Sequence, residues 1–545
     1  MGRHDFSKYT KGLVIPSPPR RDEYYEYLGK QPLRILSVVL FVLSMGVVYG
    51  ILSLGLVWYP FLLLLVVLIP WTVYIIVLAT YRPRITWESH EQVKDAGQHT
   101  LRSTVDIFIP VCGEELAIIE NTIRHVTAIK YPGRLRIYVL DDGDSPEVKA
   151  IAAKYAANYR VRPDRPAHKK SGNLNYGLSH SDAEFVVVFD ADFAPAPDFL
   201  LELMPYTLYD NIGIVQSTQY FDVKMRQTRN WIQQLSGSMQ DMFFCWAQPA
   251  RNTADASMCV GTNVIYRRTA LDAIGGFPRV DDGGEDIVTG LDMYAAGYRT
   301  MYVPVNLAKG VCPDNFNAAV NQQYRWALST MKMFVGKNVY SKSLRDAPLN
   351  MGQRIVFWSG ILYYAQSIMV LVIAVVPSLI MLWFYPYLVG IGNYLPIAPA
   401  LLGMFALPMI IRGWRLSSLR IIVVYSVAHL LAAIDTFRGT SSHWVSSGAQ
   451  VSAGSIPTRA GWVIRSWVLI SQIATWAGII VGLPVYSWAT YWPAVVLTAF
   501  QTIVLFPLLL PNYGVVAQPT LLPHLARQNY RTRQWEKQES HRSVS

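Results

Sequence analysis

The sequence of 545 residues predicts an α/β domain that is inserted between transmembrane α-helices. Two observations predict this fold class. Three long stretches, residues 35–81, 355–411 and 466–526, contain no Asp, Glu, Lys or Arg. Between the first two, residues 103–345 have the composition of a soluble domain, in which apolar strand-like runs alternate with helical periodicity. Strands that alternate with helices are typical of a mostly parallel sheet.

Composition narrows the class of protein. Hydrophobic residues make up 52% of the chain and charged residues 16%, which excludes an intrinsically disordered protein and a collagen. The four cysteines show no CxxC spacing, so no zinc site or redox dithiol is indicated, and we expect reduced thiols. The net charge of +11 fits a nucleic-acid-binding protein or a membrane protein with basic cytosolic flanks. Given the uncharged stretches, we expect the lipid bilayer as a partner and no nucleic acid.

Each uncharged stretch is long enough for two membrane crossings joined by a short turn, because one crossing needs about 20 apolar residues. About six crossings follow, as three hairpins at residues 34–81, 355–411 and 466–511. The turns carry no positive charge, whereas the segments that flank the hairpins do. By the positive-inside bias, both termini and the central domain are cytosolic. We therefore expect a multi-pass protein of the plasma (inner) membrane.

The remaining segments are assigned to the cytosolic side. Residues 1–33 form an N-terminal segment and residues 512–545 a basic tail. The apolar run Ile421–Ile434 is about 14 residues long, which is short for a crossing, so we predict an interfacial helix there. It belongs to a segment, residues 412–465, that we expect also to contain a gating loop. A further interfacial helix is expected at the end of the domain formed by residues 103–345.

Carboxylates follow the predicted strands of the central domain. The apolar runs 105–110, 135–140 and 185–189 each end in an acidic loop, and sites in parallel sheets lie beyond such strand ends. Asp190 and Asp192 are separated by one residue, so their carboxylates can point in the same direction and bind one hard cation. A divalent ion there would neutralise a diphosphate leaving group. Turn formation and helix capping are the alternative for each acidic cluster.

Two further motifs lie later in the domain. The segment Gly283–Asp286 places two glycines before a carboxylate pair that opens a predicted helix, where a carboxylate can accept a proton from a hydroxyl. The segment Gln322–Trp326 lies on a predicted helix near the membrane. Its Arg can bind phosphate oxygens, and its Trp offers a flat face to a sugar ring. The alternatives are a helix cap for the first motif and a surface amphipathic helix for the second.

Taken in order, Asp-Asp-Gly, DxD, a Glu-Asp loop and QxxRW resemble the family 2 membrane glycosyltransferases. Among these, the chain looks most similar to processive β-glycan synthases of the cellulose synthase type. The resemblance covers residues 103–345 motif by motif. It implies an α/β nucleotide-sugar transferase domain of the GT-A type, a UDP-sugar donor with UDP-glucose favoured, and Mg²⁺ or Mn²⁺ as cofactor. It also implies a growing polysaccharide chain as a partner.

The resemblance implies roles for individual residues. Asp286 is the candidate catalytic base, and Asp190 and Asp192 are the candidate metal ligands. The candidate nucleotide-sugar-binding residues are Glu114, Asp141, Asp142, Lys170, Asn173, Asp190 and Arg325. The candidate acceptor-binding residues are Glu285, Cys259, Gly261, Thr262, Gln322 and Trp326. The chain departs from the family's pattern at two places. Pro110–Glu114 match the family's P-T-Y-N-E segment, but Val111–Gly113 stand in place of T-Y-N. Glu285 and Asp286 match its T-E-D segment, but Gly284 stands in place of the Thr.

The implied reaction is an inverting displacement in which Asp286 accepts the proton of the acceptor hydroxyl. We expect a processive enzyme that polymerises a β-linked polysaccharide and exports it through its own membrane channel. One alternative is a non-processive family 2 transferase that loads a single sugar onto a membrane lipid carrier. Another is a transporter or scaffold that only senses nucleotide-sugars. The motifs do not specify the sugar, the linkage, or any accessory or homo-oligomeric subunits.

Overall fold

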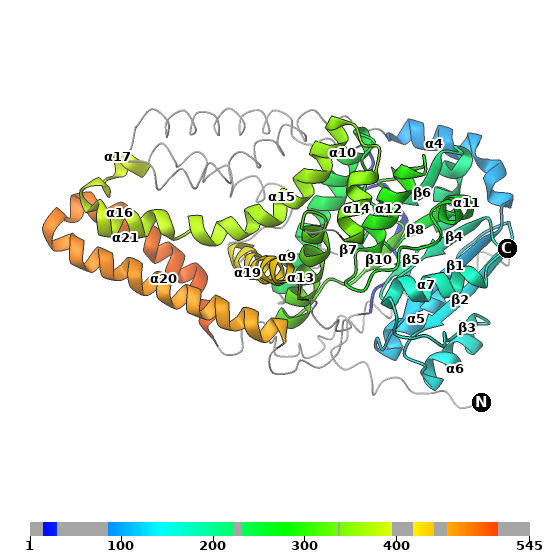
Figure 1. Cartoon of the computed structure of the whole chain (residues 1–545), viewed down its shortest axis with the longest axis horizontal. Coiled ribbons are helices and arrows are strands. Elements are labelled where there is room, and N and C mark those ends of the chain that lie inside the picture. Colours follow the sequence, from blue (N-terminus) through cyan, green and yellow to red (C-terminus); the bar gives the residue numbers. More distant parts are fainter. Residues whose placement is uncertain are drawn as a thin grey trace.

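The structure is a computed structural model, and it describes residues 15–29, 85–221, 231–335, 338–394, 418–440 and 455–510. An α/β domain lies at one end of the molecule, and long helices extend away from it (Figure 1). The predicted hairpin at residues 34–81, the gating loop and the basic tail 512–545 lie outside the described residues. Predictions about these segments stay predictions.

The main β-sheet has seven strands in the order β3-β2-β1-β4-β8-β6-β9. Its strands are β1 (Val105–Val111), β2 (Leu135–Asp141), β3 (Asn158–Arg160), β4 (Phe185–Val188), β6 (Ile212–Gln216), β8 (Val264–Arg267) and β9 (Arg299–Tyr302). Neighbouring strands are parallel except at β8, which is antiparallel to both β4 and β6. The sheet is therefore mixed: the three strands that the sequence predicts are parallel to one another and to β3, and β6 and β9 form a second parallel pair.

Apolar side chains on both faces explain why these segments form central strands. Along β1, Ile107 and Ile109 pack into one core with the helix that follows the strand, whereas Phe108 points into a second core on the other face. A strand that is buried on both faces is mostly apolar: β4 is entirely so, and β1 carries one charged residue, Asp106, which accepts from Arg136. In the pairing of β1 with β2, Val111 lies opposite Asp141, so the loops after these strands emerge at one edge.

A small second sheet supports the DxD motif. It consists of β5 (Ala194–Pro195), β10 (Ala308–Gly310) and β7 (Tyr220–Phe221), in the order β5-β10-β7. Because β5 begins two residues after Asp192, its pairing with β10 fixes the course of the chain as it leaves the motif.

Helices cover both faces of the main sheet. Those of the α/β domain and its approach are α1 (Arg21–Tyr24), α4 (Trp87–Ala96), α5 (Leu116–Val126), α6 (Pro146–Lys154), α7 (Lys169–Ser179), α8 (Phe199–Leu203), α11 (Arg268–Ala273) and α12 (Glu285–Ala295). Helix α9 (Trp231–Met242), the π-helix Phe243–Ala247 and α10 (Gln248–Thr253) follow one another without a break. Helices α13 (Phe316–Lys332) and α14 (Val339–Asp346) connect the domain to the long helices.

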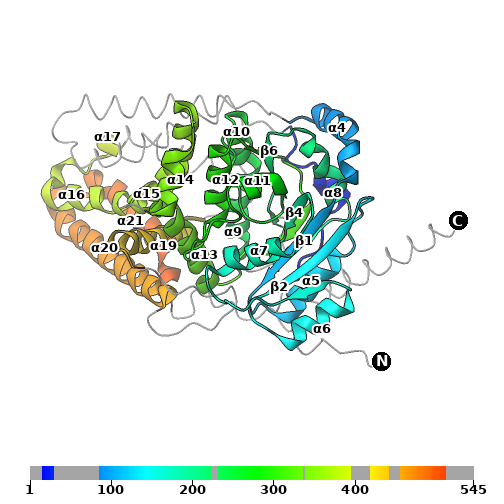
Figure 2. The ribbon, with the colours of Figure 1, turned by 45° about the vertical axis from the view of Figure 1, so that its right-hand side comes forward.

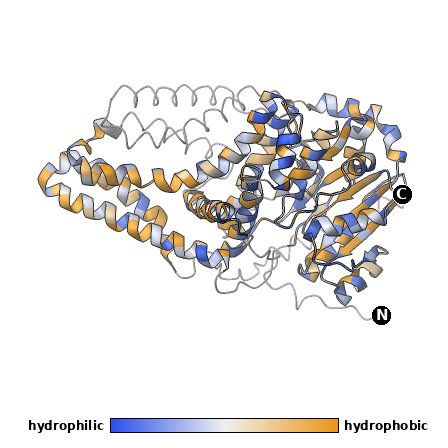
Figure 3. Cartoon of the chain, in the orientation of Figure 1, coloured by the Kyte–Doolittle hydropathy of each residue, from blue (hydrophilic) through white to orange (hydrophobic). Residues whose placement is uncertain are grey.

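The long helices are α15 (Met351–Ile373), α16 (Val376–Phe384), α19 (Ser418–Arg438), α20 (Ile456–Tyr486) and α21 (Trp488–Leu505), with the short α17 (Ile391–Tyr394) between them. Four segments of the described chain are long and apolar enough to cross a membrane: Leu362–Phe384, Ser418–Arg438, Ile456–Tyr486 and Trp488–Leu509. Hydrophobic residues dominate these helices along their length (Figure 3). The predicted break of the third hairpin is present, because α20 and α21 meet at Ser487.

Helix α19 differs from its prediction in length. The sequence predicts an interfacial helix over Ile421–Ile434, on the argument that about 14 apolar residues are too few for a crossing. The helix extends from Ser418 to Arg438, 21 residues, and 67% of an apolar window of 18 of these residues is buried. The length argument is therefore wrong, because helical structure continues through the polar ends of the apolar run. The helix lies among α13, α15 and α20 in both views of the molecule (Figures 1 and 2).

Candidate active site

A cavity of about 1330 Å³ begins at the loops that follow β1, β2 and β4 and continues past α12 and α13 to α15 and α19. Most of the predicted site residues line it: Glu114, Asp142, Lys170, Asn173, Asp190, Asp192, Cys259, Glu285, Asp286, Gln322, Arg325 and Trp326. Three predicted residues, Asp141, Gly261 and Thr262, are not part of this lining. Four motifs that are far apart in the sequence thus meet at one cavity.

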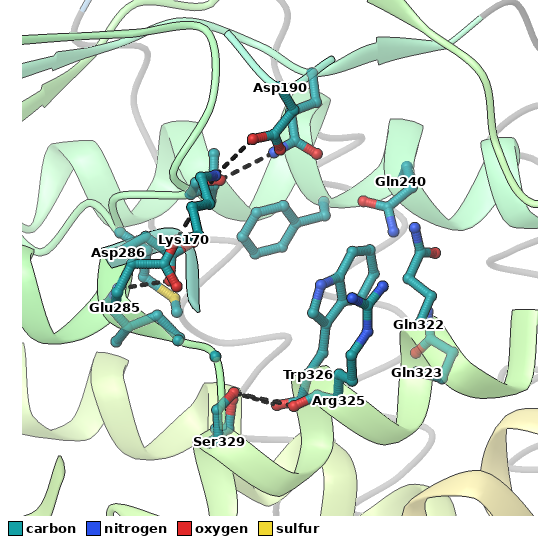
Figure 4. A pocket seen from close by; sticks show the side chains of 18 of the residues that line it. Lys170, Asp190, Gln240, Glu285, Asp286, Gln322, Gln323, Arg325, Trp326 and Ser329 are labelled. Carbon is teal, nitrogen blue, oxygen red and sulfur yellow. Dashed lines mark hydrogen bonds and ion pairs between the residues drawn. The ribbon is translucent and has the colours of Figure 1, made fainter. Parts of the chain in front are cut away.

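The Lys170 side chain connects the acidic groups of two motifs. Its Nζ lies 2.5 Å from Asp190 Oδ1 and 3.6 Å from Glu285 Oε1, and it donates to the carbonyl oxygen of Gly261 at 3.0 Å (Figure 4). Burial alone would lower the pKa of Lys170, but Asp190 and Glu285 raise it above its ordinary value. The ammonium group therefore stays charged and balances carboxylates from both sides.

The DxD aspartates project from the end of β4 into the cavity. The Asp190 backbone N–H donates to Thr262 Oγ1 at 2.9 Å, so Thr262 holds the motif from behind the cavity lining. Burial raises the pKa of Asp192 to about 7, and the charges of Asp190 and Glu114 add to this effect. A divalent cation would relieve the repulsion between these carboxylates.

We tested whether this donor set fits a metal ion. Among the described residues, no three or more His, Cys, Asp or Glu side chains gather where they could hold a metal ion. Mg²⁺ usually keeps several waters and is bound by one or two carboxylates together with substrate phosphates. Asp190 and Asp192 fit a Mg²⁺ or Mn²⁺ ion of that kind, shared with a diphosphate, and do not fit a cation held by the protein alone.

Asp286 lies in the first turn of α12, where it faces the cavity. Its Oδ1 accepts from the backbone N–H of Ile287 at 2.8 Å. Gly261 has φ +73°, and a Cβ there would lie 3.1 Å from Asp286 Oδ2, so the glycine leaves space for the carboxylate. Burial, followed by the charge of Glu285, raises the pKa of Asp286 to about 7. A carboxylate with this pKa can accept a proton near neutral pH.

The departure from T-E-D has a structural reason. Gly284 precedes α12 with φ +78°, a conformation that side chains other than glycine rarely adopt. A Cβ at this position would lie 2.7 Å from Ser329 Cβ on α13. The preceding Gly283 also has a positive φ, and its carbonyl oxygen accepts from Tyr340 Oη at 2.7 Å. The two glycines let the start of α12 pack directly on α13.

Asp141, a candidate nucleotide-sugar-binding residue, does not line the cavity. Its carboxylate is fully buried and accepts from the backbone N–H groups of Gly143 and Ser145, at 2.7 and 2.9 Å, and from Tyr159 Oη at 2.8 Å. All of these partners belong to the turn after β2 or to β3. Asp141 therefore shapes the loop, as in the turn-forming alternative, and does not face the cavity.

Sequence reasoning missed Arg162, which organises the end of the cavity at the loop after β2. Its fully buried guanidinium binds both carboxylate oxygens of Asp142 at 2.7 Å and donates to the carbonyl oxygens of Ala167 and Lys169 at 2.5 and 3.0 Å. A Cβ on Gly172 would lie 2.4 Å from Arg162 Nη1. This glycine, in the segment Lys170–Asn173 at the start of α7, therefore makes room for the arginine. A lone arginine 20 residues after Asp142 carries no motif that would have identified it.

The remaining residues on this side have buried polar contacts. Glu114 accepts from the backbone N–H of Cys112 at 2.7 Å, and burial raises its pKa. Asn173 Nδ2 donates to the carbonyl oxygen of Leu140 at 2.7 Å. Cys259 is buried in the cavity wall, where burial raises the pKa of its thiol to about 12. A thiol with this pKa stays protonated and does not act as a nucleophile.

Helix α13 presents its motif to the cavity on one side. Gln322, Arg325 and Trp326 point into the cavity, opposite Asp190 (Figure 4). Burial lowers the pKa of Arg325 from its ordinary value, but not far enough to remove its charge. Tyr324 is buried on the side of the helix that packs on α19. The same helix therefore serves the cavity and the long helices.

The cavity extends beyond the predicted motifs. On one wall it is lined by Gln240 of α9 and by aromatic side chains of the π-helix Phe243–Ala247. On the other it reaches α15 and α19, at Tyr363, Tyr364 and Tyr425. A single π-helical turn often marks a functional site, which is a signal that only the structure provides.

Comparisons with known proteins give two family matches. Residues 104–329 match the model described as glycosyltransferase like family 2, and residues 280–397 match the cellulose synthase model. Together the matched ranges contain every predicted site residue.

Curated relatives agree with these matches. Cellulose synthase 1 of Komagataeibacter xylinus is 31% identical over 325 residues, which are 58% of this chain and 20% of that protein. The UDP-forming cellulose synthase catalytic subunit of Xanthomonas axonopodis pv. citri is 30% identical over 270 residues, 49% of this chain and 36% of that protein. The chain thus matches well under half the length of these relatives. A mannosyltransferase from Pyrobaculum calidifontis, solved with GDP-Man and Mn²⁺, has a TM-score of 0.46 and 17% identity over 68% of this chain and 99% of that one.

Replacing Gly284 with Thr, which would restore T-E-D, is expected to destabilise the protein. The residue must adopt a left-handed conformation and its side chain must displace Ser329, which together cost about 2 kcal/mol or more. Gly297, with φ +88° and no atom within 4 Å of its would-be Cβ, is the matched control. We expect Gly284→Thr to lower the thermal unfolding midpoint clearly more than Gly297→Thr. Equal midpoints would show that the packing of α12 on α13 does not depend on this glycine.

Replacing Arg162 with Met is expected to leave the buried Asp142 carboxylate without its cation. Removing one partner of a buried ion pair costs about 3–5 kcal/mol. Arg165, whose exposed side chain pairs with Asp144 at 2.7 Å, provides the control, because exposed pairs contribute about 0–1 kcal/mol. Thermal unfolding of Arg162→Met should begin well below that of Arg165→Met. Similar unfolding of the two variants would contradict the role of Arg162.

Proposed function

Since the chain carries a family 2 glycosyltransferase domain and is a distant relative of bacterial cellulose synthase catalytic subunits, we propose that it is a UDP-sugar-dependent polysaccharide synthase. The proposed enzyme transfers sugars by inversion, acts processively, and makes a β-linked product, with UDP-glucose as the favoured donor. The observation that carries this proposal is the shared cavity, at which Asp286, the DxD aspartates and Trp326 meet.

The proposed reaction breaks the bond between the anomeric carbon and the diphosphate oxygen and forms a glycosidic bond to the acceptor oxygen. Asp286 accepts the proton of the attacking hydroxyl, and Arg325 donates hydrogen bonds to the departing diphosphate. A Mg²⁺ or Mn²⁺ ion, when bound, neutralises charge on that diphosphate. Asp190 and Asp192 would hold this ion, and Lys170 keeps Asp190 and Glu285 in place beside it.

The acceptor would lie on the side of the cavity that faces the long helices. Trp326 offers a ring face on which the terminal sugar can stack, and Gln322 and Glu285 offer hydrogen-bonding groups. The cavity continues from these residues to α15 and α19, both of which include segments that are apolar enough to cross a membrane. This continuity supports a route by which a polar chain leaves the site between helices instead of entering hydrocarbon.

We propose the plasma membrane as the location, with the catalytic domain in the cytosol. The basic segments that flank the apolar helices support this orientation. A non-processive transferase that glycosylates a lipid carrier would use the same donor and the same base. The size of the product separates the two functions.

Incubating the purified protein with UDP-glucose and Mg²⁺ or Mn²⁺ should release UDP and yield a polymer that a β-glucan hydrolase degrades. Asp286→Asn keeps the shape of the side chain but removes the base, so its rate should fall by about 100- to 10,000-fold. Asp292→Asn, on the same helix but outside the cavity lining, is the control and should keep the parent rate. Undiminished turnover in Asp286→Asn would overturn the assignment of the base. A single glycosylated lipid as the product would identify the non-processive function.

The rate of UDP release should depend on pH through Asp286. The base acts in its deprotonated form and has a pKa of about 7. The rate should therefore be at its maximum above about pH 7 and fall about tenfold per pH unit below it, which gives the pH profile an acidic limb. Because the charge of Glu285 contributes to raising this pKa, Glu285→Gln should move the acidic limb to lower pH. Asp272→Asn, which removes an exposed carboxylate paired with Arg268, should leave the limb in place. A limb that does not move in Glu285→Gln would exclude Asp286 as the titrating group.

A further inference from the structure

Helix α19 carries two buried titratable side chains of high polarity, His429 and Asp435, within a largely apolar segment. His429 is 0% and Asp435 5% exposed. Burying a polar or ionised group in an apolar helix is unfavourable unless the group is paired. Apolar residues at both positions would avoid this cost. The role of His429 and Asp435 is therefore inferred from the groups to which each side chain is hydrogen-bonded.

His429 connects α13 with α15. Its Nε2 lies 3.2 Å from Gln323 Oε1 of α13, and its Nδ1 lies 2.9 Å from Ser367 Oγ of α15. An amide oxygen only accepts, so Nε2 carries the proton and Nδ1 accepts from the Ser367 hydroxyl. Ser426 Oγ, at 3.1 Å from Ser367 Oγ, extends this chain back to α19. One neutral imidazole thus bonds two helices that flank the cavity.

Asp435 connects α13 with α20. Its Oδ2 accepts from Tyr324 Oη of α13 at 2.7 Å. The same carboxylate forms a two-pronged ion pair with Arg459 of α20, with distances of 3.0 and 3.2 Å. Charge-assisted bonds with this geometry are among the stronger polar contacts in proteins. The second contact lies almost two helical turns along α19 from the first.

The two contacts fix residues that are immediate neighbours of the QxxRW motif. Gln323 and Tyr324 are bonded to α19. Gln323 also lines the cavity, as do the adjacent Gln322, Arg325 and Trp326. A helix is stiff over so short a distance, so a shift of the bonded side chains moves the cavity side by the same amount. Two contacts at separate points restrict both the sliding and the rotation of α13 against α19.

We infer that His429 and Asp435 are positioning residues, which set the place of Arg325 and Trp326 relative to the long helices α15 and α20. This inference rests on the proposed function, because it assigns the effect to transfer onto the acceptor. In the proposed function the nucleotide is held mainly by the loops after β1 and β2 and by the start of α7, and Arg325 adds only its contact with the diphosphate. Disturbing the two contacts should therefore lower transfer far more than it lowers nucleotide binding.

The test uses the full-length protein with Tyr324→Phe, which removes one oxygen and leaves the pair of Asp435 with Arg459 intact, and with His429→Leu. A misplacement of about 1 Å can lower a rate on the order of 100-fold, so we expect kcat to fall by at least about tenfold and the polymer to become shorter. The affinity for UDP, measured by calorimetry, should fall much less than kcat and stay within a few-fold of the parent value. His429→Gln, whose amide can still donate to Gln323, should recover most of the rate.

Thr436→Val is the matched control on α19. The Thr436 hydroxyl is buried and donates only within the helix among the bonds described, to the carbonyl oxygen of Ala432 at 2.7 Å. This variant should keep the parent rate and polymer length. Unchanged kcat and product length in both Tyr324→Phe and His429→Leu would overturn the inference. A parallel loss of UDP affinity and thermal stability would also overturn it, because that result indicates a purely structural role. If the parent protein itself releases no UDP, the proposed function fails instead.

Discussion

The arrangement of the candidate site depends on the ammonium group of Lys170. Four carboxylates, those of Asp190, Asp192, Glu285 and Asp286, lie at one cavity, where like charges repel. Lys170 bonds Asp190 and lies within 4 Å of Glu285, so one cation links the DxD loop to the start of α12. Burial, followed by the charges of neighbouring carboxylates, raises the pKa of Asp192 and of Asp286, and Lys170 does not fully offset these effects. A site with residual negative charge of this kind is suited to a divalent ion and its diphosphate.

Close backbone approach is the second requirement of the site, and glycines meet it. Gly261 leaves room for the Asp286 carboxylate, Gly284 lets α12 pack on α13, and Gly172 admits the buried guanidinium of Arg162. In each case a single Cβ would collide with a side chain from another segment of the chain. The segments that form the cavity are thus fitted to one another. This mutual fit explains how Gly284 can replace the Thr of T-E-D without loss of order at the start of α12.

Helix α13 connects the candidate site to the apolar helices. Its Arg325 and Trp326 face the cavity, and its Gln323 and Tyr324 are bonded to α19. Because α19 is in turn bonded to α15 and α20, the position of the QxxRW residues is set by helices that are apolar enough to lie in a bilayer. The end of the cavity at the loops after β1 and β2 is set independently, by the sheet and by Arg162. The two ends of the cavity therefore have separate supports, which suits the proposed synthase, because such an enzyme must hold its donor and move its product.

The sequence by itself determined the elements whose signals are local. The runs 105–110, 135–140 and 185–189 agree with β1, β2 and β4 to within one residue, because continuous apolar, β-branched segments form buried strands, and the order of the motifs was sufficient to indicate the family. The tertiary structure decided what depends on partners distant in the chain. It assigned Asp141 to a turn, Asp142 to Arg162, and His429 and Asp435 to α13, and it extended α19 beyond its apolar run. Periodicity and propensity report how a segment is buried, whereas the choice of partner for a buried charge is made only when the chain has folded.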